Sequence, residues 1–417
     1  MLVNNEILLA SALLVASTAM QALAQASPCV TPIDSTPLWS GGDQNGGAVF
    51  DGRYIYDIER DAALNVMLTI VDTSGGQLTR VSSRLISTLS TNACALSGAI
   101  AIAGDEVYVL TNEGLRVFDV SDRSAPSFVR LVGPPLLGTG CAGNLGVAAN
   151  DEVVVTLSGG LIQVHDRGLL RVPDPPFPMI PNNPLVRTVP TAPLAGILGE
   201  VLVRDHLAVV LTQSDLAVID LSTPATASIV QVAADTPFFL ASHMTLDEDG
   251  RLYVTQSFTP ILTVFETLSP LATPVPIDPI IGLIPPIDVS ADDGFIAIGN
   301  SQSGVQLVDI RDPSEPEIVA QLPQDPAFSV TLSNGSLFIP GTDTFDLRWF
   351  DVSACLTPAP CSPADLAPPN GSLDFFDVLE YLALFDAQDP AADLAAPFGS
   401  FDFFDVLEYL AQFDAGC

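Results

Sequence analysis

The sequence contains no lysine, and its 14 basic residues, all arginines, stand against 49 acidic residues, which gives a formal net charge of −35. Nucleic-acid binding depends on clusters of basic side chains that neutralise phosphates, and this composition argues against nucleic acid as a partner. The acidic surface instead suits divalent cations, salty surroundings or a basic protein.

Histidines and catalytic motifs are also scarce. The only histidines are His165, His206 and His243, each in a different repeat of the chain. The sequence has no GxSxG nucleophile elbow, no HExxH zinc motif and no Walker loop. A Ser-His-Asp arrangement assembled from distant segments leaves no local signature. Nothing in the residue pattern therefore argues for an enzyme, and we predict no catalytic residues and no organic cofactor.

Apolar stretches are short, and the most continuous one lies at the N-terminus. Residues 7–20 form an apolar run that ends near Ala22-Leu-Ala24 and Ala24-Gln-Ala26, two small-x-small cleavage patterns. This arrangement predicts a secretory signal peptide over residues 1–26, with the atypical feature that Met1–Glu6 carries no basic residue. No later run reaches transmembrane length without proline, glycine or charge. We expect an exported protein, secreted or associated with the cell surface, without a transmembrane segment in the mature chain.

Six cysteines follow the predicted signal peptide, and none has the close CxxC spacing of a zinc or redox site. An even number in an exported protein predicts disulfides. The pairs we expect are Cys361–Cys417, which would close the C-terminal segment, Cys94–Cys141, and Cys29–Cys355, which would join the ends of the large domain.

The region from about residue 40 to 358 is built from a repeated pair of signals. The first is a turn followed by a β-rich run, which begins at Asp51, Gly104, Asn150, Asp205, Asp249, Asp293 and Asn334. The second, ten to fifteen residues later, is a short apolar strand that closes on Asp72, Asp119, Asp166, Asp220, Glu266, Asp309 or Asp351. Asp-Gly and Asn-Gly are dipeptides typical of hairpin turns. Asp before Ser/Thr and Pro also favours a turn, so the acidic residues that close the apolar strands are interpreted as turn residues.

Seven such units, spaced by about 41–55 residues, predict a seven-bladed β-propeller over residues 40–358, after an N-terminal segment at 27–39. The stretches that begin at Gly114 and Gly304, which read GLRVFDVSDRSAP and GVQLVDIRDPSEP, resemble the LVIVD-repeat propellers of bacterial secreted and surface proteins. The resemblance implies the fold strongly and the function weakly, because propellers host unrelated activities.

The C-terminal segment contains a duplication. Residues 365–385 recur at 393–413, 28 residues later, and each copy is an acidic loop followed by an amphipathic helix. In the first copy Val378, Leu379, Leu382 and Phe385 have helical spacing and are expected to share one face. The carboxylates at the loop–helix junction have two interpretations. They are ligands of a calcium ion, which prefers oxygens, or they cap the helix N-termini.

This segment, residues 361–417, resembles the dockerin family, in the variant that is bracketed by cysteines and ends in Gly416-Cys417. The resemblance implies that calcium is the cofactor and that a cohesin-like or cell-surface protein is the partner. The implied metal ligands are Asp365, Asn370, Asp374, Asp377, Asp393, Asp402 and Asp405. The implied partner-binding residues are Phe375, Phe376, Phe403 and Phe404, which could alternatively form a core. The usual Asp-x-Asn-x-Asp start is replaced by DLAPP and DLAAP, and Phe398 stands where the first copy has Asn370.

The sequence thus predicts an all-β seven-bladed β-propeller with a small all-α C-terminal domain made of two loop–helix units. The function we expect is that of an exported, non-catalytic binding or scaffold protein, whose propeller presents a binding surface and whose dockerin-like domain docks it. The alternative is a secreted propeller hydrolase or lyase that acts on polysaccharide and is delivered by its dockerin.

Overall fold

The structure is a computed structural model of the chain, and it falls into two compact units, one that ends at Val352 and one that begins at Ser353. The residues it describes are 29–37, 48–60, 65–87, 99–111, 113–133, 146–158, 160–173, 183–192, 194, 198–212, 215–233, 241–247, 249–256, 262–265, 275–277, 288–300, 304–312, 316–322, 327, 329–340, 346–356, 361–367 and 373–416.

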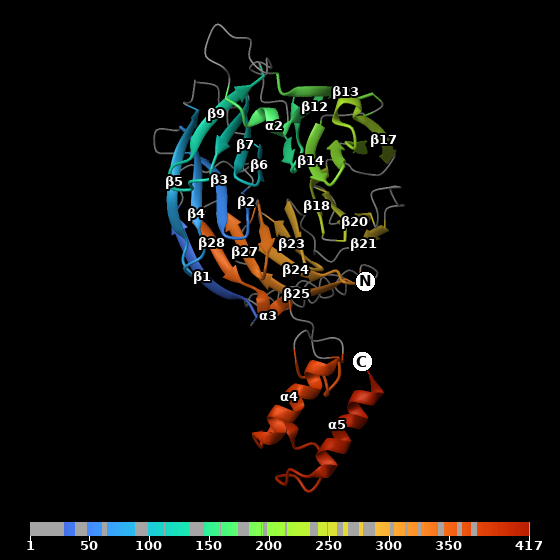
Figure 1. Cartoon of the computed structure of the whole chain (residues 1–417). Coiled ribbons are helices and arrows are strands. Elements are labelled where there is room, and N and C mark those ends of the chain that lie inside the picture. The colour runs from blue at the N-terminus through green and yellow to red at the C-terminus, as the bar shows by residue number, and fades with distance from the viewer. Residues whose placement is uncertain are drawn as a thin grey trace, which may run out of the picture. The chain divides into compact units, whose positions relative to one another are not determined.

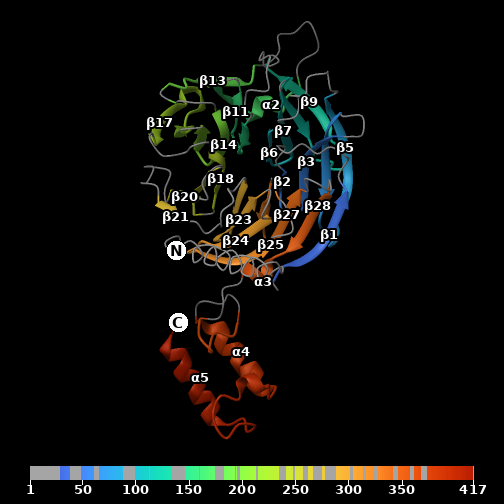
Figure 2. The same ribbon diagram turned by 180° about the vertical axis from the view of Figure 1, so that it is seen from behind.

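The first unit is a seven-bladed β-propeller, as predicted, in which each blade is a four-stranded antiparallel sheet (Figures 1 and 2). The innermost strands are β2 (Val49–Phe50), β6 (Ala99–Ala103), β10 (Gly146–Ala149), β14 (Leu198–Arg204), β18 (Ala241–Leu246), β22 (Asp288–Asp292) and β26 (Thr331–Ser333). The second strands are β3 (Tyr54–Arg60), β7 (Glu106–Thr111), β11 (Val153–Ser158), β15 (Leu207–Thr212), β19 (Leu252–Gln256), β23 (Phe295–Asn300) and β27 (Ser336–Pro340). The third are β4 (Val66–Asp72), β8 (Gly114–Asp119), β12 (Leu161–Asp166), β16 (Leu216–Asp220), β20 (Leu262–Phe265), β24 (Gly304–Asp309) and β28 (Asp346–Asp351). The outer strands are β5 (Thr79–Ser87), β9 (Ser127–Val132), β13 (Leu185–Val189), β17 (Ser228–Ala233), β21 (Val275–Ile277), β25 (Glu317–Leu322) and, in blade 7, β1 (Thr31–Pro37). Two short helices, α2 (Arg167–Leu170) and η1 (Pro224–Thr226), follow the third strands of blades 3 and 4.

The ring is closed by a strand from the start of the chain. β1 pairs antiparallel with β28, with Thr31 opposite Asp351 and Pro37 opposite Asp346, and so completes the last blade (Figure 1, blue β1 beside orange β28). The segment 27–39, predicted from the sequence to precede the propeller, contains β1, which belongs to the propeller. Pairing of β1 with the last blade covers one edge of β28 and one edge of β1 at once.

The repeated turns lie where the sequence predicts them, between the first and second strands of the blades. Asp293 and Gly294 both have positive φ, at 45° and 74°, and Asn334 and Gly335 follow the same pattern at 49° and 71°. Two successive residues with positive φ are the requirement of a type I′ hairpin turn, which Asn-Gly and Asp-Gly fulfil at little cost. The third strands are the predicted apolar strands that close on an acidic residue.

Apolar side chains hold neighbouring blades together. Tyr56, Leu68 and Ile70 of blade 1 pack against Val107 and Phe118 of blade 2 in one buried cluster, and equivalent clusters lie between other neighbouring blades. Since each middle strand has a blade on both sides, both of its faces are apolar; all six residues of β11 are buried. This two-sided burial explains the nearly continuous Val, Ile and Leu runs in the sequence.

The second unit contains α3 (Ser353–Leu356), α4 (Phe375–Asp386), η2 (Pro390–Ala392) and α5 (Phe403–Ala415). Its two longer helices are the helices of the two sequence copies. Among the described residues of both units, no helix combines the length and apolar character needed to cross a membrane.

Candidate functional site

The two copies of the C-terminal unit meet through a pair of tyrosines. Tyr381 of α4 and Tyr409 of α5 occupy the same position in the repeat, and their rings stack in parallel with centroids 4.0 Å apart. Both are about 1% exposed, and Tyr409 Oη donates to the carbonyl of Ala364 at 3.4 Å. Burial, with a smaller contribution from the Asp377 carboxylate, raises the pKa of Tyr409 to about 12. The pair is therefore an uncharged aromatic centre of a small core.

Each helix of this unit begins with a capping box. Asp374 is the N-cap of α4 and accepts a hydrogen bond from Phe376 N at 2.7 Å, and Asp377 accepts one from Asp374 N at 2.8 Å. In α5, Asp402 accepts from Phe404 N and Asp405 accepts from Asp402 N, each at 2.8 Å. The capping interpretation of these four aspartates, one of the two left open by the sequence, is what the structure shows.

Asp377 and Asp405 also hold the loops that precede their helices. Asp377 Oδ1 accepts from Leu366 N at 2.7 Å and from Ala367 N at 2.8 Å, and Asp405 Oδ1 accepts from Ala395 N at 2.7 Å. Both residues are buried. Burial by itself raises the pKa of Asp377, but the backbone amides outweigh it and hold the pKa below its ordinary value. For Asp405 the same amide hydrogen bonds are the largest effect and lower its pKa. Both carboxylates are thus kept ionised by backbone N–H groups.

The other predicted metal ligands are engaged in the same manner. Asp365 Oδ2 accepts from Cys361 N at 2.8 Å, and Asp393 Oδ2 accepts from Gly399 N. Asn370 lies outside the described residues. Calcium needs about six to eight oxygens directed at one point. Among the described residues, no group of three or more His, Cys, Asp or Glu side chains is placed to hold a metal ion. The described carboxylates of these loops therefore do not converge on one point, and calcium binding stays a prediction from the sequence.

The four phenylalanines singled out as partner-binding residues are exposed rather than buried in a core. Phe375 and Phe403 are each 67% exposed, and Phe376 and Phe404 are 59% and 62% exposed. Sequence reasoning missed the leucines that continue the surface at helical spacing, which are Leu379 and Leu382 in α4 and Leu407 and Leu410 in α5. We name the two sets the α4 face (Phe375, Phe376, Leu379, Leu382) and the α5 face (Phe403, Phe404, Leu407, Leu410).

The expectation that Val378, Leu379, Leu382 and Phe385 share one face is wrong. Val378 and Phe385 pack against the tyrosine core, while Leu379 and Leu382 are exposed. The apolar residues of α4 therefore form two stripes, one inward and one outward. With 3.6 residues per turn, the α4 face lies on the side of the helix away from Tyr381, which stacks against α5. The same holds for α5 by the repeat, so the two faces point away from each other.

The cysteines of the described part of the chain are all oxidised. Cys29, Cys355 and Cys361 are each in a disulfide, and no free cysteine occurs among the described residues. Cys94, Cys141 and Cys417 lie outside the described residues, so the three pairings proposed from the sequence stay predictions.

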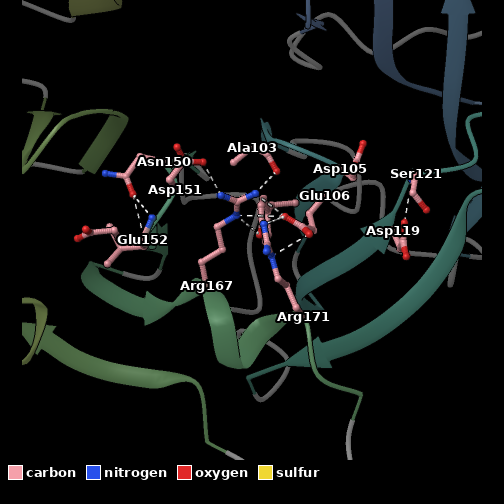
Figure 3. A network of polar contacts seen from close by, with 12 residues as sticks. Ala103, Asp105, Glu106, Asp119, Ser121, Asn150, Asp151, Glu152, Arg167 and Arg171 are labelled. Carbon is pink, nitrogen blue, oxygen red and sulfur yellow. Dashed lines mark hydrogen bonds and ion pairs between the residues drawn. The ribbon is translucent and has the colours of Figure 1, made fainter.

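The propeller contributes a polar network between blades 2 and 3 that the sequence did not reveal (Figure 3). Arg167, at the start of α2, is buried; its guanidinium donates to Glu106 Oε2 at 2.6 Å, to the carbonyl of Ala103 at 2.5 Å and to Asp151 Oδ1 at 2.7 Å. A Cβ atom on Gly104 would lie 2.8 Å from Arg167 Nη2, so glycine there makes room for the arginine. Arg171 also binds Glu106, at 2.8 Å. We call this set the Arg167 clasp.

Blades 1 and 2 are joined in a similar way, which indicates that the Arg167 clasp is a structural contact between neighbouring blades. Arg123 follows the third strand of blade 2, as Arg167 follows that of blade 3, and it reaches Tyr56 Oη at 3.1 Å and Asp105 Oδ1 at 2.6 Å. Five acidic residues at the ends of third strands accept from a backbone amide two or three residues later, as in Ser121 N to Asp119 at 2.8 Å. The five are Asp72, Asp119, Asp166, Asp220 and Asp309. For these five the interpretation as turn residues is confirmed, and Glu266 lies outside the described residues.

The histidines do not gather at one place in the described structure. His165 is buried against Thr156 Oγ1 at 3.2 Å, and burial lowers its pKa to about 4. His243, on the inner strand β18, has Nδ1 3.4 Å from Asp288 Oδ1 on β22 and 3.7 Å from Glu200 Oε2 on β14. Burial alone lowers the pKa of His243, but the two carboxylates outweigh it and raise the pKa to about 9.

Comparison with known proteins supports the propeller and leaves its activity open. Residues 97–132, which correspond to blade 2, match the family model described as the LVIVD repeat. No curated protein matches the chain in sequence. Among solved structures, the chain is similar to a streptogramin B lyase (TM-score 0.54, 10% identity, 77% of this chain and 96% of that one). It is also similar to a chain of the mitotic checkpoint complex (0.55, 12%, 77% and 92%). A third similar structure is a catalytically inactive virginiamycin B lyase from Staphylococcus aureus with quinupristin (0.52, 11%, 76% and 98%). At these identities the likeness shows the fold alone: this chain contains a seven-bladed β-propeller with an LVIVD repeat.

Proposed function

We propose that this is an exported, non-catalytic protein in which a binding propeller is attached to a docking unit, and that the α4 and α5 faces contact the receptor. The observation that carries the proposal is the exposure of four phenylalanines and four leucines on two helices of one small unit. Contiguous apolar surface of this kind is rare on a soluble monomer and marks an interaction site. Aromatic side chains also supply much of the energy of protein interfaces.

Charge defines the kind of receptor that fits these faces. From Ser353 to Cys417 the chain has eleven acidic residues and no Arg, Lys or His. Glu380 and Glu408 are exposed beside the two faces. A second copy of this unit or an anionic lipid surface would be repelled, whereas a protein with an apolar patch rimmed by Lys and Arg would be attracted. We therefore assign the receptor to a cohesin-like or other cell-surface protein with a basic rim.

The repeat gives the unit two equivalent ways to dock. The exposed fractions of Leu379 and Leu382, 45% and 48%, are matched by 44% and 47% for Leu407 and Leu410. A receptor that accepts the α4 face will accept the α5 face in the rotated orientation. Removal of one face should therefore weaken docking, and removal of both should abolish it.

The test is co-sedimentation of the purified full chain with washed cell envelopes of the source organism. The variant Phe375→Ser/Phe376→Ser/Phe403→Ser/Phe404→Ser should stay in the supernatant, while the wild type sediments. Val230→Ser is the matched control, because Val230 is an apolar propeller residue with 51% exposure. Equal sedimentation of the fourfold variant, with unchanged thermal unfolding, would refute docking through these faces.

The enzyme alternative has one cluster in its favour, the carboxylates of Glu200 and Asp288 beside His243 on the inner strands. Both are already used in blade packing. Glu200 Oε2 accepts from Met244 N of the next blade at 2.7 Å, and Asp288 Oδ2 accepts from Val330 N of the next at 2.8 Å. Because these bonds join neighbouring inner strands, the cluster is explained as a link between blades, and we favour the non-catalytic function.

A further inference from the structure

The loops of the C-terminal unit are organised by backbone amides that point at aspartates. In the first copy, three amides, those of Leu366, Ala367 and Asp374, donate to the two oxygens of Asp377. In the second copy, the amides of Ala395 and Asp402 donate to the two oxygens of Asp405. A cation requires oxygen atoms around it, whereas the groups that converge here are N–H donors, whose positive ends repel a cation.

We infer that Asp377 and Asp405 occupy the structural role that the dockerin resemblance assigns to calcium, so that the described parts of both loops are held in place without a metal ion. Each aspartate connects the first turn of its helix with the loop before it, which is the connection that a shared calcium ion would otherwise make. Hydrogen bonds from backbone amides to charged carboxylates are among the stronger hydrogen bonds in proteins. Docking, if the proposed function is right, is then independent of calcium.

The remaining loop residues add little for a cation. In the second copy Asp393 Oδ1 is buried and has no hydrogen-bond partner among the described residues, but one oxygen falls far short of the about six to eight that calcium needs. Asp374 and Asp402 direct one oxygen each to the amide of the second helical residue, and Asp365 and Asp393 accept from Cys361 N and Gly399 N. The segments Leu366–Ala367 and Leu394–Ala396 offer no side-chain oxygen, and Phe398 is 74% exposed at the position of Asn370. Since the same arrangement occurs at Asp377 and Asp405, two independent loops carry the inference.

The first test is hydrogen–deuterium exchange by mass spectrometry on the full oxidised chain, once with a chelator and once with excess calcium chloride. We expect equal protection of the peptides that cover residues 361–367 and 393–402 in the two conditions. A calcium-dependent increase in protection at these peptides would overturn the inference. Exchange is read locally, so any binding of calcium elsewhere on the acidic surface does not confuse the result.

The second test replaces one acceptor atom. Asp377→Asn keeps the shape of the side chain but turns one acceptor into an NH2 donor, which faces either Asp374 N or the Leu366 and Ala367 amides. Exchange of these amides should become at least about tenfold faster, as expected when hydrogen bonds to a buried charge are lost. Loss of protection over the whole unit, with the propeller unchanged, would support the same conclusion. Asp405→Asn should do the same to residues 394–402.

The matched control is Glu380→Gln, an equal change of charge on the exposed side of α4 that should leave exchange unaffected. Unchanged protection in both Asp→Asn variants would overturn the inference. Envelope co-sedimentation with chelator present separates the two proposals. If the wild type sediments only with calcium while its exchange is insensitive to calcium, the docking mechanism needs revision and the role of the aspartates stands.

Discussion

The propeller and the C-terminal unit are both built from repeats, but each repeat of the propeller is buried on more of its surface than each repeat of the C-terminal unit. In the propeller every blade has two neighbours, and the ring has no end, so the middle strands are largely buried on both faces, and β11 is buried throughout. In the C-terminal unit each copy has one neighbour, and the outward stripe of each helix stays exposed. A closed array covers its repeated surfaces internally, whereas a pair leaves the second surface of each copy exposed.

The greatest loss of stability is expected at the centre of the C-terminal unit, where Tyr409 stacks on Tyr381. Tyr409→Ala removes half of the stacked pair and should cost about 3–5 kcal/mol, the usual cost of truncating a buried aromatic residue. A unit of this size has about that much stability in total, so it should unfold by itself. Calorimetry should show loss of its transition, with the propeller transition retained.

Leu410→Ala is the control for this substitution, because Leu410 is the next residue of α5 and is 47% exposed. It should change stability by no more than about 0.5 kcal/mol. Simultaneous loss of both transitions in Tyr409→Ala would show that the two units fold together and do not bury their repeats separately.

A smaller effect is expected where two blades meet. Arg167→Gln breaks the ion pair with Glu106, whose side chain is 12% exposed, and leaves that carboxylate with Arg171 alone and the Ala103 carbonyl without its donor. Removal of one partner of a buried pair costs about 3 kcal/mol. The urea midpoint of the propeller should fall accordingly. Arg171→Gln should have an effect below about 1 kcal/mol, because Arg171 is 49% exposed. Equal effects of the two substitutions would mean that the buried arginine does not join the blades.

The smallest expected effect is a pH dependence of the propeller. Since the carboxylates of Asp288 and Glu200 raise the folded-state pKa of His243 to about 9, protonated His243 stabilises the ring at pH values below the ordinary histidine pKa. This stabilisation is lost as the pH rises through about 9. The melting temperature should therefore fall less with rising pH in His243→Gln than in the wild type. Identical pH profiles of the wild type and His243→Gln would show that His243 does not link blades 4, 5 and 6.

The sequence predicted the features that depend on short stretches of chain. The turns at Asp293-Gly294 and Asn334-Gly335 and the third strands each follow from local residue chemistry, and their sevenfold recurrence defined the fold. β1 was missed because its pairing with β28 depends on a partner more than three hundred residues away. The local residues of β1 contain no signal that identifies that partner.

The candidate site was predicted in part, for similar reasons. The phenylalanine pairs were singled out by the dockerin resemblance, with a core role as the alternative, and they are exposed. Leu379 and Leu382 were assigned to the wrong face because two apolar stripes on one helix look like one broad stripe in sequence. The anchoring of Leu366 N and Ala367 N by Asp377 spans ten and eleven residues and requires the loop to fold back. Arg167 was missed because its partners lie in another blade.

The pairing of β1 with β28 also determines when the propeller can become complete. During synthesis Thr31 is made early and Asp351 late, so the first strand must wait, unpaired, until the last blade has been made. Contacts this distant in sequence form slowly and only after the intervening blades exist. The propeller therefore cannot close before Asp351 has been made, and a ribosome that stops within the last blade leaves a chain with an open sheet edge at both ends.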